Sequence, residues 1–406
     1  MNQKLSSLLL PLSLHNFIGR PLHLVPTPCL LIDEKAYERN LMLMKNRAKE
    51  LNEMVMTRAH FKAHKCPAIA KDQIERGGAI GVCCQKLSEA VEALKAVDDV
   101  LISNEVVNVD KLRVIRNMNE ISGKTISLCV DNEQIVTLID KIMAESNEPN
   151  QKLQLVVEYN VGQNRCGTNS EEETLKLIKL IEKCKHVEFK GLQCYKGANQ
   201  HIVKYEDRKE AVARVVEKVK RLLDYLSQNG VFVKYVTGGG TGTFEFEASS
   251  DVFTEIQPGS YLFGDADYGK ILTSSNGKTM LEDESAFSQS LYILTTIVSK
   301  VPNTRIVVDA GLKASSLDSG VPIIADAEHR KILSNYKPGG DEHGIFEAHS
   351  EKAQELINSL NVGDVLKLIP GHVDPTFNMY DMVAFFNPDN HLITRVESIT
   401  ARGPGI

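Results

Sequence analysis

Residues 211–243 read AVARVVEKVKRLLDYLSQNGVFVKYVTGGGTGT and contain one helix, one strand and a glycine-rich loop in succession. Apolar residues recur at spacings of three and four in the first part, which predicts an amphipathic helix. The run Val231 to Thr237 that follows is rich in β-branched residues and predicts a strand. The apolar stripe of the helix consists of Val212, Val215, Val216, Val219, Leu222, Leu223 and Leu226.

The same alternation recurs along residues 30–265, where amphipathic segments such as Ser88 to Val97 and Glu171 to Cys184 separate short apolar runs. Eight alternations in about 230 residues favour a (β/α)8 barrel, because a doubly wound sheet usually has five to seven strands. The predicted barrel covers residues 31–270. Its eight strands are predicted at Met54 to His60, Ala79 to Cys84, Val100 to Asn104, Thr125 to Val130, Leu153 to Tyr159, Phe189 to Tyr195, Val231 to Thr237 and Phe253 to Ile256.

The pattern changes after Tyr268, where apolar runs follow one another without long helical segments between them. We therefore predict a β-rich domain over residues 271–406, with one helix at Glu351 to Asn358. The N-terminal segment, residues 1–30, is expected to pack with this domain. The predicted strands of the domain are Leu291 to Val301, Thr304 to Val308, Val365 to Ile369, Met382 to Phe386 and Leu392 to Val396.

The composition indicates a soluble globular protein whose partner is a small molecule. Of 406 residues, 42% are hydrophobic and 25% charged, and the net charge of -6 offers no general attraction to nucleic acid or to an anionic membrane. No run is long enough to cross a bilayer, and Pro11 interrupts the only stretch that resembles a signal peptide, Ser6 to Leu14. Eight cysteines without a C-x-x-C pair indicate reduced thiols and a cytoplasmic location.

A basic run, RAHFKAHK at residues 58–65, ends the first predicted barrel strand. If the strand continues through this run, Arg58, His60, Lys62 and His64 all point into the barrel mouth. A lysine crowded by like charges becomes a better nucleophile for a carbonyl group, which suits Lys62 for a Schiff base. The alternative is a solvated run of charges.

The seventh strand ends in TGGGTGT at residues 237–243, where glycine N–H groups and threonine hydroxyls could bind a phosphate. A flexible turn is the alternative, since glycine-rich loops alone are weak signals. The spacing fits neither the dinucleotide fingerprint nor Walker A. The eighth strand is followed by a second donor-rich turn, QPGSY at residues 257–261.

Near the C-terminus, His372 and Asp374 stand two residues apart between prolines, in PGHVDPT. On an extended segment both side chains would face one way and could bind Mn²⁺, Mg²⁺, Co²⁺ or Zn²⁺. Such a pair is also common as ordinary surface polarity.

Taken together, these motifs resemble the D-threonine aldolase and D-serine dehydratase family of fold-type III pyridoxal-phosphate enzymes, which is related to alanine racemase. The resemblance runs from about Pro26 to Tyr380 and rests on motifs in the family's order. They are RAHxKxHK at Arg58, GQxRCG at Gly162, GLQxYxG at Gly191, TGGGTGT at Thr237, QPGSY at Gln257, DAGLKA at Asp309, DSGxP at Asp318 and GHxDPT at Gly371.

The resemblance implies a role for each matching residue. Lys62 is the lysine that binds pyridoxal 5'-phosphate covalently, Arg165 lies beside the phenolic oxygen of the cofactor, and Tyr195 stacks on its ring. Gln257 stands where alanine racemases have an arginine facing the pyridine nitrogen, and His201 is the base. Gln85, which follows the second strand, is a further candidate for contact with the cofactor. The phosphate-binding positions are Gly239, Gly240, Thr241, Gly259 and Ser260, and the divalent metal ligands are His372 and Asp374.

The implied reaction is retro-aldol cleavage of a D-β-hydroxy-α-amino acid, of the D-threonine or D-3-hydroxyaspartate type, to glycine and an aldehyde. Asp374 favours this aldolase branch, because the dehydratase branch typically has cysteine there. The alternatives are a D-serine or D-3-hydroxyaspartate dehydratase, which releases a keto acid and ammonia, and a carrier of pyridoxal phosphate without turnover. The resemblance also implies a homodimer in which one chain's barrel faces the other chain's β-rich domain.

Overall fold

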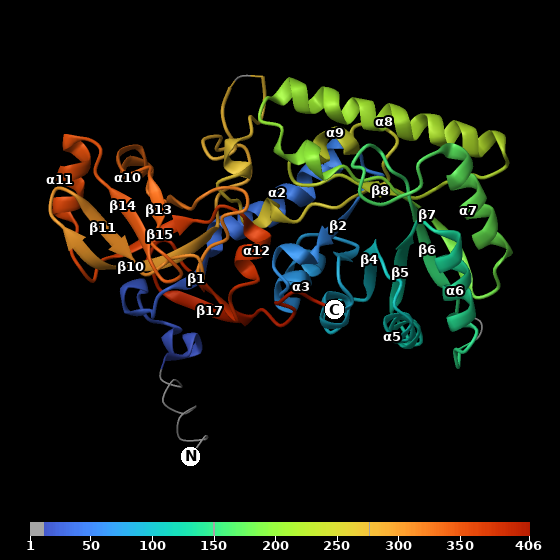
Figure 1. The fold of residues 1–406 in the computed structure, drawn as a ribbon, viewed down its shortest axis with the longest axis horizontal. Helices are drawn as coiled ribbons and strands as arrows, with labels where there is room; N and C mark the ends of the chain where they lie inside the picture. The colour runs from blue at the N-terminus through green and yellow to red at the C-terminus, as the bar shows by residue number, and fades with distance from the viewer. Residues whose placement is uncertain (1–11, 149–150, 276) are drawn as a thin grey trace, which may run out of the picture. The chain divides into compact units, whose positions relative to one another are not determined.

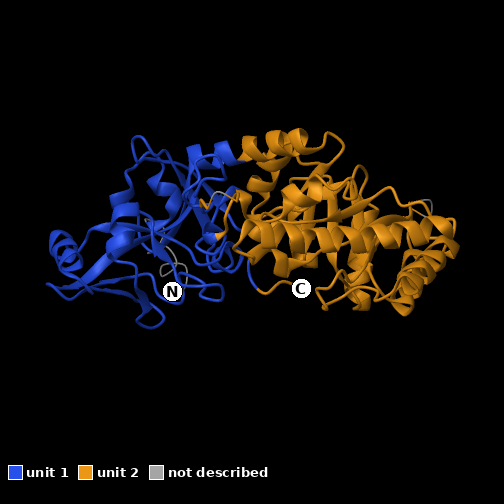
Figure 2. Cartoon of the chain, turned by 90° about the horizontal axis from the view of Figure 1, so that it is seen from above, with its two compact units in different colours: residues 1–40, 262–270, 279–403 blue, residues 41–261, 271–278, 404–406 orange. Residues whose placement is uncertain are grey.

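The computed structural model describes residues 12–148, 151–275 and 277–406 (Figure 1). Residues 1–11, which include most of the stretch that resembles a signal peptide, lie outside the described residues. The chain divides into two compact units, which Figure 2 colours separately. Unit 1 comprises residues 1–40, 262–270 and 279–403, and unit 2 comprises residues 41–261, 271–278 and 404–406. Within the described part of the chain, no helix has the length and apolar character that a membrane span needs.

Unit 2 contains a closed barrel of parallel strands in sequence order, which confirms the predicted fold. The prediction located every strand, with differences of a few residues at the ends. The strands are β2 (Met56–His60), β3 (Gly81–Cys84), β4 (Asp99–Glu105), β5 (Thr125–Val130), β6 (Leu153–Glu158), β7 (Val187–Gln193), β8 (Val236–Gly238) and β9 (Glu255–Ile256).

Helices connect the strands and cover the outside of the barrel (Figure 1). Polar residues start several of them, because a side-chain oxygen can accept from the unpaired N–H groups of the first turn. Asn108 Oδ1 accepts from Asp110 N at 3.0 Å, and Ser170 Oγ accepts from Glu173 N at 3.2 Å. The helices are α2 (Glu34–Leu51), α3 (Pro67–Glu75), α4 (Leu87–Ala93), α5 (Val109–Asn119), α6 (Glu133–Met143), α7 (Glu171–Lys183), α8 (Tyr205–Gln228) and α9 (Phe244–Ala248).

Unit 1 is built on a nine-stranded sheet that includes the N-terminal strand β1 (Cys29–Asp33). β1 pairs antiparallel with β10 and parallel with β16. Buried apolar residues of η2 (Leu14–Phe17) and η3 (Leu22–Leu24) pack in a core cluster with residues of β1 and β16. The remaining strands are β10 (Leu291–Val301), β11 (Arg305–Val308), β12 (Ile323–Ile324), β13 (Tyr336–Pro338), β14 (Gly344–Glu347), β15 (Val365–Ile369), β16 (Met382–Phe386) and β17 (Ile393–Ser398).

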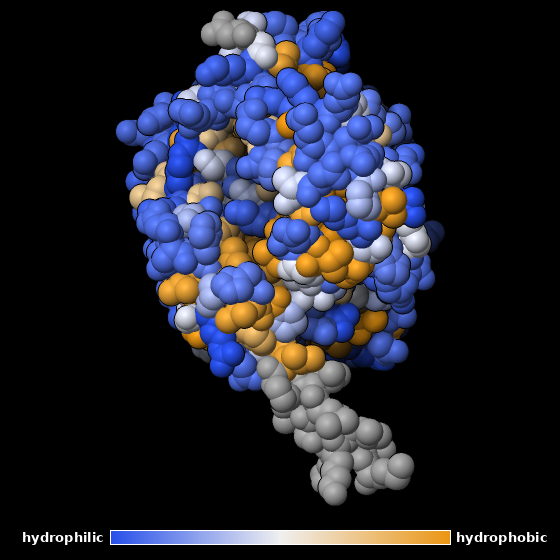
Figure 3. Space-filling model, turned by 90° about the vertical axis from the view of Figure 1, so that its left-hand side faces the viewer, coloured by the Kyte–Doolittle hydropathy of each residue, from blue (hydrophilic) through white to orange (hydrophobic). Residues whose placement is uncertain are grey.

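The prediction of a single helix in this unit was wrong. Besides α11 (Glu351–Ser359), the unit contains α10 (Ala327–Ile332) and α12 (Val373–Phe377), which are too short to show a helical repeat of apolar residues. Figure 3 shows mostly hydrophilic residues on one face of the molecule, with apolar ones in separate patches. Exposed apolar residues of this unit include Ile18, Leu24 and Val362.

Candidate active site

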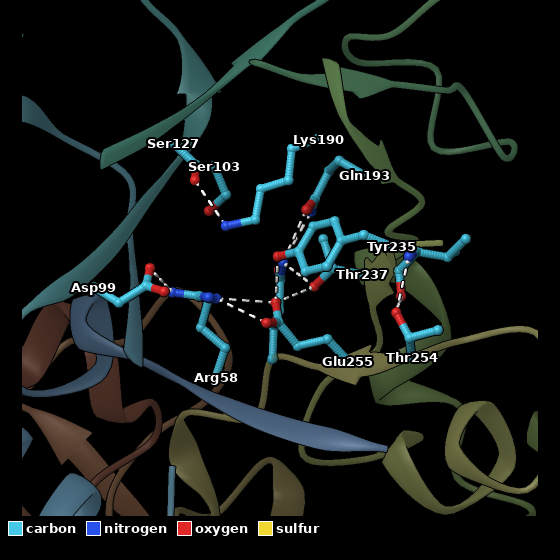
Figure 4. Close-up of polar contacts among 12 residues, drawn as sticks. Arg58, Asp99, Ser103, Ser127, Lys190, Gln193, Tyr235, Thr237, Thr254 and Glu255 are labelled. Atoms are coloured by element: carbon cyan, nitrogen blue, oxygen red, sulfur yellow. Dashed lines mark hydrogen bonds and ion pairs between the residues drawn. The ribbon is translucent and has the colours of Figure 1, made fainter. Parts of the chain in front are cut away.

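A polar network, which we name the floor of the barrel, is formed by the buried Arg58 and Glu255 and the half-buried Asp99, Lys190 and Tyr235 (Figure 4). Arg58 Nε donates to both carboxylate oxygens of Glu255 at 3.0 Å, and Arg58 Nη1 donates to Asp99 Oδ1 at 2.7 Å. Gly81 makes room for this guanidinium, since a Cβ there would lie 2.4 Å from Arg58 Nη1. Arg58 therefore belongs to the barrel interior, where its charge is paired.

Lys190 completes the floor from β7. Its Nζ donates to Ser127 Oγ at 2.9 Å and lies 5.0 Å from the centre of the Tyr235 ring. Burial lowers the pKa of Lys190, and the nearby charge of Arg58 lowers it further. Tyr235 Oη donates to Glu255 Oε1 at 2.6 Å. Sequence reasoning missed Lys190, Tyr235 and Glu255 because no local motif contains them.

Lys62 lies on a short 3-10 turn, η4 (Phe61–Ala63), directly after β2. The predicted alternation through residues 58–64 was therefore wrong beyond His60, where the strand ends. His64 is fully buried and its Nε2 lies 3.1 Å from Gln73 Oε1 of α3, so it packs against that helix. Lys62 is half-buried.

The turn after β9 packs directly against the turn that carries Lys62. A Cβ on Gly259 would lie 3.0 Å from His60 Cβ and 3.2 Å from Ala63 Cβ, so a larger residue there would press on the end of β2 and on η4. His60 N also donates to Pro258 O at 3.0 Å. On the other side, Gln85 Nε2 lies 3.2 Å from His60 Nε2 and donates to Ser103 Oγ at 2.9 Å. The structure thus brings Gln85, Gly259 and the Lys62 turn together.

The glycine-rich loop after β8 is held by Gln200, a residue that the sequence did not single out. Gln200 Nε2 donates to Thr243 Oγ1 at 2.7 Å, and Gln200 Oε1 accepts from Gly242 N at 2.9 Å. Gly240 and Gly242 pack so closely on Gln200 that an added Cβ would lie 2.7 Å and 2.5 Å from its atoms. The loop is therefore closely packed against Gln200.

Thr241 fits the chemistry of a phosphate site at this loop. Among the described residues, the buried Thr241 Oγ1 has no hydrogen-bond partner, although a buried hydroxyl normally has one. Gly239, next to it, has φ 71°, which glycine adopts without strain. A phosphate oxygen would satisfy the Thr241 hydroxyl.

Carboxyl groups gather at the ends of three neighbouring strands, another feature that the sequence analysis missed. The ligand atoms of Glu105, Asp131 and Cys166 lie within 4.8 Å of one another. Burial and, after it, the adjacent Glu105 raise the pKa of Glu158 to about 8, although Arg165 opposes the shift. Glu158 therefore holds a proton at neutral pH. Acidic residues directly after predicted strands were the available signal.

Arg165, Tyr195 and His201 lie on loops that follow the barrel strands. Arg165 is exposed and is close enough to Glu158 to stabilise its charged form. Tyr195 is half-buried two residues after β7, and a Cβ on Gly197 would lie 3.3 Å from Tyr195 Cε1. His201 ends the 3-10 helix η5 (Gly197–His201) and is exposed.

The vicinal cysteines Cys83 and Cys84 end β3 and are buried. Cys83 and Cys84 are free and fully buried, and burial raises the pKa of both thiols well above the ordinary value. A thiol with a raised pKa is a poor nucleophile.

His372 and Asp374 belong to unit 1 and lie at the start of α12. The prediction that both residues share an extended segment was wrong, because His372 is the N-cap and Asp374 is in the first helical turn. Asp265 holds this turn, since its buried Oδ2 accepts from Val373 N at 3.0 Å. His372 Nδ1 lies 2.7 Å from Asp318 Oδ2.

Comparison with known proteins identifies the family. Residues 32–267 match the family described as "Alanine racemase, N-terminal domain", and residues 290–386 match "Putative serine dehydratase domain". The chain is 37% identical over 382 residues to the 3-hydroxy-D-aspartate aldolase of Paracoccus denitrificans (strain Pd 1222), covering 94% of this chain and 93% of that protein. The chain belongs to the D-threonine aldolase and D-serine dehydratase family. The resemblance found in its motifs is confirmed.

Two further relatives place the chain near the aldolases of this family. It is 36% identical over 386 residues to the D-threonine aldolase of an Arthrobacter species, with 95% of each chain covered. The crystal structure of D-threonine aldolase from Filomicrobium marinum superposes with a TM-score of 0.86 at 34% identity, covering 95% of this chain and 98% of that one. The family's barrel and β-rich domain are thus both present.

Proposed function

We propose that this chain catalyses retro-aldol cleavage of a D-β-hydroxy-α-amino acid to glycine and an aldehyde with pyridoxal 5'-phosphate as cofactor. Identity of 36–37% to two aldolases over nearly the whole chain supports the reaction class. The cofactor assignment is supported by the packed glycine loop, in which the Thr241 hydroxyl has no partner among the described residues. When bound, pyridoxal phosphate stabilises the negative charge left at Cα of an amino acid.

Each residue at the carboxyl ends of the strands has a task in this proposal. Lys62 would hold the cofactor covalently on η4. Arg165 would contact its phenolic oxygen and Tyr195 its ring face, while Gln257 would face its ring nitrogen. Gln85 would support the Lys62 turn through His60. The phosphate would be bound by Gly239, Gly240, Thr241, Gly259 and Ser260, which lie on the turns after β8 and β9.

His201 would take the proton of the substrate β-hydroxyl as the Cα–Cβ bond breaks, which is the role of a general base. Its side chain is exposed at the end of η5, where a substrate could contact it. A His201→Asn variant should lose turnover by about 100-fold or more, a typical contribution of general base catalysis. It should still bind cofactor, which an absorbance titration would show.

The direct test is to measure the products. Purified protein with pyridoxal phosphate should release equal amounts of glycine and acetaldehyde from D-threonine, and glycine and glyoxylate from D-3-hydroxyaspartate. L-Threonine is the control substrate. A keto acid and ammonia, formed from D-serine or D-3-hydroxyaspartate with higher kcat/KM than any aldehyde, would establish the dehydratase reaction in place of the aldolase reaction.

We further propose that His372 and Asp374 bind a divalent metal ion. The contact between His372 Nδ1 and Asp318 supports this, because histidine ligands usually donate their other ring N–H to a carboxylate. An oxygen ligand at Asp374 suits Mn²⁺ or Mg²⁺ better than Zn²⁺. A bound ion would supply Lewis acidity toward the substrate hydroxyl.

The metal proposal is tested by chelation and by substitution. Protein treated with a chelator should lose cleavage and retain pyridoxal phosphate, and Mn²⁺ should restore activity. His372→Ala should resemble the chelated protein, whereas a variant of the exposed His349, His349→Ala, should bind Mn²⁺ normally. Full activity without metal, or loss of cofactor and of thermal stability together with the metal, would contradict this role.

Two properties follow from the family and the thiol content. We propose a homodimer, for which light scattering should give about twice 45.0 kDa. A fully active monomer would contradict it.

We also propose a cytoplasmic location, because all eight cysteines are free. Fractionation of the producing cells would test the location.

A further inference from the structure

A chain of hydrogen bonds runs from the barrel floor to Gln257. Thr237 Oγ1 lies 2.7 Å from Glu255 Oε1, and Gln257 Nε2 lies 2.8 Å from Thr237 Oγ1. The parallel register produces this contact, since Thr237 is opposite Glu255 in the β8–β9 pair and Gln257 follows Glu255 by two residues on the same face. All three side chains are at most 3% exposed.

The direction of each hydrogen bond follows from the groups themselves. Glu255 is the carboxylate partner of Arg58 in a buried ion pair and can only accept. The single proton of the Thr237 hydroxyl must therefore point to Glu255. Toward Gln257 the same hydroxyl can only accept, so the amide nitrogen of Gln257 must face it. The negative charge of Glu255 therefore determines, through Thr237, how the Gln257 amide is oriented.

Gln193 uses the second N–H of the same amide. Gln257 Nε2 lies 2.8 Å from Gln193 Oε1, and Gln193 Nε2 donates back to Gln257 Oε1 at 3.3 Å. Both amide hydrogens of Gln257 are then engaged. Its carbonyl oxygen has two lone pairs and receives one long bond, so Gln257 can offer a ligand only an acceptor.

We propose that Glu255 and Thr237 are positioning residues that keep the Gln257 oxygen as an acceptor, so that the cofactor's ring nitrogen is bound in its protonated form. This inference rests on the proposed function, which places that nitrogen at Gln257. A neutral acceptor beside the nitrogen stabilises the N–H form. An arginine at the same place, as in alanine racemases, is a donor and favours the unprotonated nitrogen. A protonated ring withdraws electrons more strongly from Cα.

The test is nitrogen NMR of the whole protein loaded with pyridoxal phosphate labelled with ¹⁵N in its ring. Free labelled cofactor, measured below and above its own ring titration, gives the positions of the protonated and neutral forms. We expect the wild-type resonance at the protonated position from pH 6 to pH 8. A wild-type resonance at the neutral position would overturn the inference without further variants.

Two substitutions of Thr237 test the positioning. Thr237→Val keeps the shape and removes the hydroxyl, which frees the Gln257 amide to turn, and we expect the resonance to move toward the neutral position. Thr237→Ser keeps the hydroxyl and should keep the protonated signal. An unchanged signal in Thr237→Val would overturn the positioning role. If Thr237→Val does not fold, Thr237→Ala tests the same point, because it also removes the hydroxyl and leaves the ion pair of Arg58 with Glu255 in place.

Trapping of the labelled cofactor on Lys62 by borohydride separates this inference from the proposed function. Absence of label on Lys62 would overturn the proposed function and this inference with it. Label on Lys62 together with a neutral ring nitrogen would overturn only the inference.

Discussion

The floor of the barrel and its glycine loop each contain buried polar side chains, yet they differ in how many of the hydrogen bonds of those side chains are made within the protein. At the floor, Arg58 is paired with Glu255 and Asp99. At the loop, Thr243 Oγ1 contacts Gln200 and Glu247, whereas the neighbouring Thr241 Oγ1 has no partner among the described residues. A buried polar group without a partner is costly, so it indicates where a ligand supplies the missing bond.

The difference separates residues that serve the fold from residues that serve the ligand. A charged side chain that is paired within the protein contributes to stability, and this contribution should be the same with and without the cofactor. A buried hydroxyl without a partner contributes to cofactor binding, and its removal should hardly change the free energy of unfolding. Five substitutions test this division.

Loss of Lys62 should have the largest effect. Lys62→Ala removes the amine that would bind the cofactor, so cleavage should fall by at least about 1,000-fold, in the range found when covalent catalysis is lost. Mass spectrometry after borohydride reduction should find no lysine that carries the cofactor. Lys71→Ala, at an exposed lysine of α3, is the control and should retain both label and activity. Label on another lysine of Lys62→Ala would refute the assignment.

Glu255→Gln tests the floor. It leaves the buried Arg58 without the more deeply buried of its two carboxylate partners, and breaking a buried ion pair in this way costs about 3–5 kcal/mol of unfolding free energy. Glu210→Gln breaks an exposed pair with Arg214 and should cost at most about 0.5 kcal/mol. Urea denaturation measures both. Equal effects would show that the floor does not stabilise the barrel.

Thr241 and Thr243 test the division within one loop. Thr241→Val should weaken pyridoxal phosphate binding by about 10-fold or more, since a hydrogen bond to a charged group contributes about 1.5–3 kcal/mol, and stability without cofactor should hardly change. Thr243→Val removes the partner of Gln200 and Glu247 and should cost about 1–3 kcal/mol of stability. If Thr241→Val destabilises the protein without cofactor as much as Thr243→Val does, the unpartnered hydroxyl does not indicate a ligand.

The pH dependence of stability tests Glu247, a buried carboxyl group of α9. Burial raises the pKa of Glu247 from 4.5 to about 8, so the folded protein holds a proton that the unfolded chain releases over that range. Stability should therefore fall as pH rises from about 4.5 to about 8 and level off above it, by at most about 1.4 kcal/mol per pH unit for this group.

Glu247→Gln removes this titration. Compared with wild type, its urea midpoint should decline less between pH 6 and pH 8. Glu188→Gln, at an exposed position of β7, should follow the wild-type curve. Parallel curves for wild type and Glu247→Gln would show that Glu247 has an ordinary pKa in the folded protein.

The barrel was predictable because its signals are local. Each strand is a short apolar run, and each long helix, such as α8, shows a stripe of apolar residues. The short elements of unit 1 were missed for the same reason. α10 has six residues and α12 has five, too few for a repeat to be visible. The strand pattern also failed after His60, where a 3-10 turn replaces the extended chain.

The sequence alone determined the barrel, the glycine-rich loop and the family to which the chain belongs, since all of these depend on spacing within short stretches. Only the tertiary structure decided which polar residues satisfy one another. Arg58 and Glu255 are 197 residues apart in the chain, and closure of the barrel makes them neighbours. The pairing of Thr237 with Gln257, and hence the acceptor that Gln257 presents, likewise depends on strand register, because hydrogen-bond direction is set by neighbours in space and not by neighbours in sequence.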